Sequence, residues 1–100
     1  MKIFSVGTTL RITDVNELSA TTAPALRDNF RAALKPDTTA VEIELSDTKF
    51  LDSSGLGALI SIQKTMATRQ GSICVVNPTS TVVQVLELTR LHRVIEVVRR

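Results

Sequence analysis

The sequence has no tryptophan, no tyrosine and only three phenylalanines among its 100 residues. Modules that bind RNA loops or single strands rely largely on aromatic side chains on which bases stack, so this scarcity argues against such a module. It also disfavours an aromatic-lined groove for a sugar or a peptide. No apolar stretch approaches the roughly 18 residues of a membrane span, and no N-terminal targeting signal is evident. We therefore expect a cytoplasmic protein that does not insert into a membrane.

The chain has one cysteine and one histidine, so it offers few candidates for a nucleophile or a general base. Cys74 cannot form an internal disulfide, and its place in the apolar run 73–76 predicts a buried, inert thiol. His92 lies in a different segment, so no Cys–His pair is indicated, and no carboxylate is placed to orient it as a base. We expect that the chain is not an enzyme and has no catalytic residue, cofactor or metal site of its own.

The formal net charge of +2 is concentrated at one end of the sequence. In the last eleven residues four arginines face a single glutamate, and the remainder of the chain is close to neutral. Nucleic-acid binding usually needs a basic patch on the fold rather than a basic end. We therefore expect no nucleic-acid partner.

Length and hydrophobic periodicity predict a single domain over residues 1–100. Apolar runs and alternations predict strands, and apolar residues at helical spacing predict helices between them. The expected strands are 2–6, 9–13, 40–45, 73–76 and 94–98, and the expected helices are 21–35, a segment from the 52–57 region to about residue 70, and 80–88. Strands that alternate with helices favour parallel neighbours. We expect an α/β fold with a mostly parallel sheet of four to five strands and an antiparallel N-terminal edge hairpin.

Two glutamates in one predicted strand indicate where the helices lie. Glu42 and Glu44 alternate with Val41, Ile43 and Leu45, whereas a strand covered by helices on both faces is typically apolar throughout. The two carboxylates could in principle pair for acid–base chemistry, but nothing around them suggests a cleft. A solvated sheet face is the better explanation, so we expect helices mainly on one face.

The segment 50–57, Phe-Leu-Asp-Ser-Ser-Gly-Leu-Gly, carries the most functional information. It leads into a helix, whose first turn has unpaired N–H groups and a partial positive charge. Gly55 and Gly57 permit close approach of another group. Ser53 and Ser54 place two hydroxyls where a loop would expose them.

Four interpretations of this segment compete. The first is structural, with Asp52 or Ser53 acting only as the helix N-cap. A hydrolase serine is disfavoured because G-x-S-x-G is absent and His92 would have to serve as base without an orienting group. A phosphate-binding loop is disfavoured because its motif and a nearby basic residue are both missing. The fourth is a reversible switch, in which phosphorylation adds about −1.5 to −2 charges and rejects a partner surface.

The string Phe50–Gly57 resembles the signature of the bacterial anti-anti-sigma factors, which belong to the STAS (sulfate transporter and anti-sigma factor antagonist) family. Two further segments resemble the family in the same order. Residues 16–26 resemble the stretch that enters its first helix, and residues 85–91 resemble its late helix and exit. The resemblance covers nearly the whole chain and implies a layered domain with helices on one side of the sheet.

The resemblance also implies a mechanism called partner switching. The unphosphorylated domain binds an anti-sigma factor and thereby frees the sigma factor. The anti-sigma factor is commonly also a serine kinase of the histidine-kinase-like ATPase fold, which brings ATP and Mg²⁺. It phosphorylates the second serine of the signature, here Ser54, and the complex dissociates. A metal-dependent serine phosphatase resets the switch, and the domain itself is expected to be a monomer or weak dimer.

Around Ser54, the resemblance assigns partner contact to Asp52, Ser53, Gly55, Leu56, Gly57 and Ser19. Ser19 stands where the family usually carries an aspartate, and Arg90 stands where it often carries a glycine. Many relatives also add a C-terminal helix. The missing aspartate favours an alternative role, that of an adaptor subunit without phosphate turnover in a lipid-transport ATPase or a stress-sensing complex.

Overall fold

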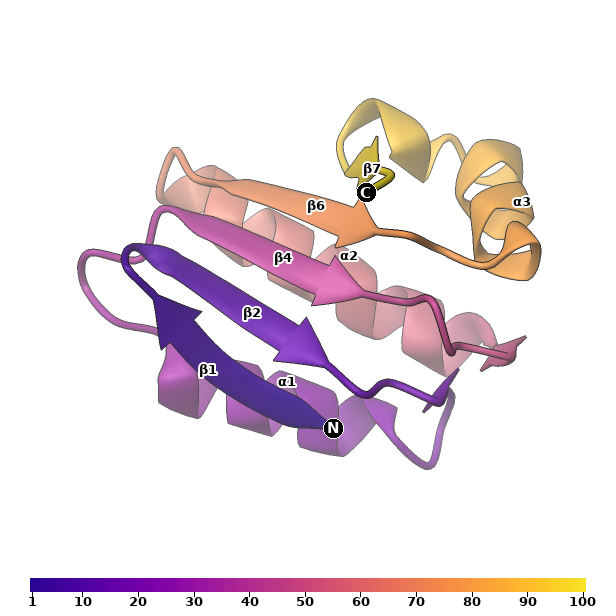
Figure 1. Ribbon diagram of the computed structural model, residues 1–100, viewed down its shortest axis with the longest axis horizontal. Helices are drawn as coiled ribbons and strands as arrows, with labels where there is room; N and C mark the ends of the chain where they lie inside the picture. Colours follow the sequence, from indigo (N-terminus) through magenta and orange to yellow (C-terminus); the bar gives the residue numbers. More distant parts are fainter.

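The N-terminal hairpin forms the antiparallel edge of a five-stranded sheet. We describe residues 1–100 from a computed structural model (Figure 1). Strands β1 (Lys2–Val6) and β2 (Thr9–Thr13) pair with Ile3 opposite Ile12. Gly7 in the turn between them has a φ of +61°, which glycine adopts without the steric cost that other residues meet.

Parallel strands complete the sheet in the order β1-β2-β4-β6-β7, with β4 at Ala40–Glu44, β6 at Ser72–Val76 and β7 at Glu96–Val98. Helices α1 (Ala23–Ala33), α2 (Ser53–Thr68) and α3 (Ser80–Leu88), with a short 3₁₀ turn η1 (Leu91–Arg93), form the connections. The predicted α/β fold is confirmed: β1 runs antiparallel to β2, and the remaining pairs are parallel. None of the helices is long and apolar enough to cross a membrane.

The core lies between one face of the sheet and the helices. In Figure 1, α1 and α2 lie behind the sheet, and α3 lies towards the edge that carries β7. The alternating apolar residues of the strands point into this layer and are fully buried, among them Leu10, Ile12, Val41, Ile43 and Val75. Leu59, Ile62 and Met66 of α2 cover them. The expectation that helices cover one face is therefore confirmed.

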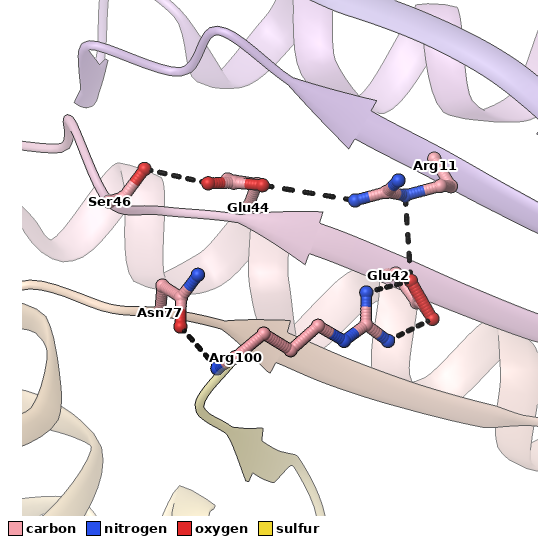
Figure 2. Close-up of polar contacts among 6 residues, drawn as sticks. All are labelled: Arg11, Glu42, Glu44, Ser46, Asn77 and Arg100. Atoms are coloured by element: carbon pink, nitrogen blue, oxygen red, sulfur yellow. Dashed lines mark hydrogen bonds and ion pairs between the residues drawn. The ribbon is translucent and has the colours of Figure 1, made fainter.

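The open face carries an ionic network in place of a second helical layer. Arg100 donates two hydrogen bonds to the Glu42 carboxylate, at 3.1 and 2.8 Å, and Arg11 lies between Glu42 and Glu44 (Figure 2). The hydrogen bonds from Arg100, aided by the charge of Arg11, hold the pKa of Glu42 below its ordinary value. The predicted solvated face is thus a face of paired charges, whose aliphatic stems also cover the strands.

Two very short strands lie outside the main sheet. Strand β3 (Glu17–Leu18) pairs in parallel with β5 (Phe50–Leu51). Neither is among the strands expected from the sequence, because two residues cannot display a periodicity. This small ladder joins the turn before α1 to the turn before α2, so it positions the segment that the sequence singled out.

Two local features differ from what the sequence pattern suggests. A glycine just after a helix, as at Gly71, commonly caps it in the left-handed conformation, but here Gln70 adopts that conformation, with a φ of +59°. Gly71 is required instead for close approach, because a Cβ there would lie 2.7 Å from the carbonyl oxygen of Thr39. Cys74 is half-buried on the open face rather than enclosed in the core. Its partial burial nevertheless raises the pKa of the thiol.

Candidate functional site

The candidate site is the turn from β5 into α2, residues 50–57, which we call the Ser54 corner. It lies at the end of the sheet to which the parallel strands β2, β4 and β6 point (Figure 1). The carboxyl ends of strands in open α/β sheets are where ligands and partners are usually bound. The turn before α1 lies beside it, because β3 and β5 are paired.

Asp52 fixes the shape of the corner from both sides. One carboxylate oxygen, Oδ1, accepts a hydrogen bond from the Gly55 N–H at 2.9 Å, and the other accepts one from the Ala20 N–H at 3.0 Å. These backbone hydrogen bonds, the one from Gly55 first, lower the pKa of Asp52. Asp52 is therefore the N-cap of α2, as one interpretation predicted, and it also clamps the turn before α1.

Gly55 allows α2 to rest directly on β3. A Cβ at this position would lie 2.0 Å from the carbonyl oxygen of Leu18, which is an impossible contact. The same carbonyl accepts a hydrogen bond from the Asp52 N–H at 3.0 Å. Gly55 is buried, so it can shape a partner surface only through the backbone that it allows.

The two serines present their hydroxyls at the start of α2. Ser53 is exposed and Ser54 is partly exposed. Neither hydroxyl forms a hydrogen bond within the protein, and neither is among the polar atoms sealed from solvent. The Ser54 hydroxyl is therefore unpaired and not sealed from solvent. Leu56 and Gly57 are also partly exposed on the same turn.

Ser19 lies beside the corner but beneath its surface. Its side chain is enclosed, with 4% of the residue exposed. The hydroxyl donates to a Glu17 carboxylate oxygen at 2.6 Å and accepts from the Thr21 N–H at 3.2 Å. This burial leaves Ser19 almost no surface to offer a partner, so its visible role is to shape the turn before α1, where Ala20 and Thr21 are exposed.

Sequence reasoning missed two neighbours of the corner. Phe50 is 54% exposed. The exposure of Phe50 could have been predicted from strand alternation, because Leu51, the next residue, is half-buried. Arg27 of α1 extends to Gly57, where its Nη2 would lie 3.1 Å from a Cβ. No local sequence pattern predicts the contact of Arg27 with Gly57, because the two residues belong to different helices. No group of three His, Cys, Asp or Glu side chains that could hold a metal ion is present.

A layered α/β fold with a glycine-lined, serine-bearing corner at the start of its second helix is the architecture of a STAS domain. The STAS domain model matches residues 6–100, and the chain belongs to this family. The resemblance of the sequence is therefore confirmed.

Particular relatives carry the name of anti-sigma factor antagonist. The anti-sigma-B factor antagonist of Listeria monocytogenes is 25% identical over 81 residues, which cover 81% of this chain and 71% of that protein. A crystal structure of a candidate anti-sigma factor antagonist from Thermotoga maritima has a TM-score of 0.87 at 24% identity, covering 99% of this chain and 85% of that one.

The anti-sigma factor antagonist SpoIIAA of Bacillus also shares the fold. Its unphosphorylated form has a TM-score of 0.74 at 19% identity, covering 96% of this chain and 85% of that one. A structure of its phosphorylated form has a TM-score of 0.69 at the same identity, covering 96% and 88%.

Proposed function

We propose that this protein is an anti-sigma factor antagonist. In its unmodified form it binds an anti-sigma factor through the Ser54 corner, which frees the sigma factor, and phosphorylation of Ser54 ends that binding. The proposal draws on the Listeria relative, which is an anti-sigma-B factor antagonist by name, and on the membership of the STAS family. We propose that the anti-sigma factor is itself a serine kinase of the histidine-kinase-like ATPase fold.

The single observation that carries the proposal is the state of the Ser54 hydroxyl. It forms no hydrogen bond and is not sealed from solvent, although the backbone on both sides of it is held by Asp52 and by the packing of Gly55 on β3. A free hydroxyl on a rigid turn is well suited to a partner's active site, because little conformational entropy is lost when it docks.

Phosphoryl transfer to this hydroxyl needs chemistry that the partner supplies. The Ser54 oxygen attacks the γ-phosphorus of ATP held with Mg²⁺ in the kinase; the new P–O bond forms as the bond to ADP breaks, and the hydroxyl proton passes to a base of the kinase. A metal-dependent phosphatase reverses the modification with water and releases inorganic phosphate. The antagonist contributes the acceptor and its orientation.

The charge of the product explains why the partner would leave. A phosphoserine carries about −1.5 to −2 charges at neutral pH. Near the start of α2 the helix dipole makes this charge tolerable within the fold, so the domain need not unfold. The carboxylate of Asp52 lies two residues away and strengthens the negative field. A partner surface that packs against an uncharged hydroxyl would have to desolvate this anion, which is costly.

Phosphorylation mapping tests the proposal directly. The protein is incubated with ATP, Mg²⁺ and candidate anti-sigma factor kinases from its own genome, and the modified residue is located by mass spectrometry. We expect phosphate on Ser54 in the unsubstituted protein. The Ser53→Ala variant should be phosphorylated to the same extent, and the Ser54→Ala variant should not be phosphorylated. A kinase that is active on another substrate yet leaves Ser54 unmodified would argue against phosphorylation as the gate.

A further inference from the structure

An unpaired cationic side chain lies close to the proposed phosphorylation site. Arg27, in the second turn of α1, is half-buried against α2, and one guanidinium nitrogen lies 3.1 Å from the position that a Cβ of Gly57 would take. The four ion pairs of the protein all lie elsewhere. Arg27 also donates no side-chain hydrogen bond, so the packing against α2 leaves its charge without a partner.

The arrangement of the two helices directs this charge towards Ser54. Helices α1 and α2 pack against one another, and both begin at the end of the sheet that carries the Ser54 corner (Figure 1). The bond from the Ala20 N–H to Asp52 ties their first turns together. Side chains of a helix lean towards its N-terminus, so the long side chain of Arg27 leans towards the end where Ser54 lies.

Spacing along α2 brings the two groups within reach. Ser54 and Gly57 are three residues apart and therefore share a face of the helix, with about 5–6 Å between their Cβ positions. The guanidinium lies over Gly57 on that face. Because Gly57 has no side chain, no Cβ occupies the position beside the guanidinium, so the long Arg27 side chain can reach towards a phosphate on Ser54, one turn earlier on the same face.

We infer that Arg27 binds the phosphate of phosphorylated Ser54 within the same molecule. Guanidinium and phosphate form short, often bidentate hydrogen bonds that lysine cannot match in geometry. The pair would hold the phosphate against the flank of α1 and offset its repulsion by Asp52, the N-cap carboxylate two residues earlier. This inference rests on the proposed phosphorylation of Ser54. It makes Arg27 a positioning residue of the phosphorylated state, and the missing side chain of Gly57 leaves room for the guanidinium beside the phosphate.

The inference is tested on protein that carries phosphoserine at position 54 through genetic encoding, so that no kinase is needed. The second pKa of the phosphate, about 6 in a free phosphoserine, is measured by phosphorus NMR titration. We expect Arg27→Gln to raise it by roughly one unit relative to the unsubstituted phosphoprotein, because an adjacent cation favours the dianion. Arg27→Lys should retain part of the difference.

Two further variants separate pairing from a merely structural effect. Arg31→Gln removes the next cation of α1, which is exposed and one turn further from Ser54. This variant should leave the phosphate pKa unchanged. Gly57→Ala leaves every charge in place but fills the gap, so it should raise the phosphate pKa in the same direction as Arg27→Gln. Equal phosphate pKa values in the unsubstituted protein and Arg27→Gln, both folded by circular dichroism, would overturn the inference.

The outcome is distinguishable from that of the proposed function. If phosphate on Ser54 abolishes binding to the anti-sigma factor while Arg27→Gln leaves the phosphate pKa unchanged, the switch stands and the role of Arg27 is refuted. If Arg27→Gln shifts the phosphate pKa but the phosphoprotein binds the anti-sigma factor as tightly as the unmodified protein, Arg27 pairs as inferred and the proposed gating fails.

Discussion

Gly55→Ala is the substitution whose effect the structure specifies most sharply. Alanine favours a helix by about 0.5–1 kcal/mol over glycine, so propensity alone predicts a small gain in stability. The added Cβ, however, would lie 2.0 Å from the carbonyl oxygen of Leu18 and 2.2 Å from its carbon, whereas carbon atoms in contact settle at about 3.5–4.0 Å. The obstacle is backbone, so a rotamer change cannot relieve it.

Relief requires α2 to move away from β3, which would break the bond from the Asp52 N–H to the Leu18 carbonyl and expose apolar surface. Overpacking of this kind usually costs about 1–3 kcal/mol, and we expect the upper end, about 3 kcal/mol in the free energy of unfolding. In urea denaturation the midpoint should fall by roughly 1–3 M, given the usual slopes of about 1–3 kcal/mol per M for small proteins.

Gly57→Ala is the matched control on the same helix. Its Cβ would approach only the mobile end of the Arg27 side chain, at 3.1 Å, which can move aside. The free energy of unfolding should therefore change by less than about 1 kcal/mol. Equal stability losses in the two variants, or none in Gly55→Ala, would refute the packing of α2 on β3 described here.

Three further outcomes are expected. Arg90 adopts a left-handed conformation with a φ of +61°, so Arg90→Gly should raise the free energy of unfolding by about 0.5–1 kcal/mol in urea denaturation, and an unchanged midpoint would contradict that strain. Hydrogen bonds from Arg100 hold the pKa of Glu42 below its ordinary 4.5, so this contribution is complete above pH 4.5 and is lost as the pH falls further. Glu42→Gln should therefore flatten the loss of stability as the pH falls below about 4.5, and a parallel pH profile would refute it. Ser54→Asp should weaken anti-sigma factor binding by on the order of 2 kcal/mol in calorimetry, about thirtyfold, whereas Ser54→Asn, of the same size without the charge, should weaken it less.

Much of the fold could be predicted because its signals are local and repeated. The alternation of Val41, Ile43 and Leu45 with two glutamates predicted both a strand and a face free of helices, and each new alternate residue strengthened the pattern. The element ends differ more: the strand expected at 94–98 begins at Glu96, because the N–H of buried Ile95 donates to the Leu91 carbonyl of the preceding turn rather than into the sheet.

The candidate site was only partly accessible to sequence reasoning. Asp52 and the two glycines predicted a capped, close-packed helix start, because these signals lie next to one another in the sequence. The bond from the Ala20 N–H to Asp52 spans 32 residues, and the contact of Arg27 with Gly57 joins two helices. Such contacts depend on how the elements pack, so no spacing in the sequence predicts them. The burial of Ser19, expected at the partner surface, follows from the same packing.

The most direct test of the proposed switch compares one protein in two states. The affinity of the anti-sigma factor for the unmodified domain, and for the domain with encoded phosphoserine at position 54, is measured by titration calorimetry at the same ionic strength. The switch predicts measurable binding of the unmodified domain and at least about a thirtyfold weaker binding of the phosphorylated one. Equal affinities for the two states, with both domains folded, would contradict it.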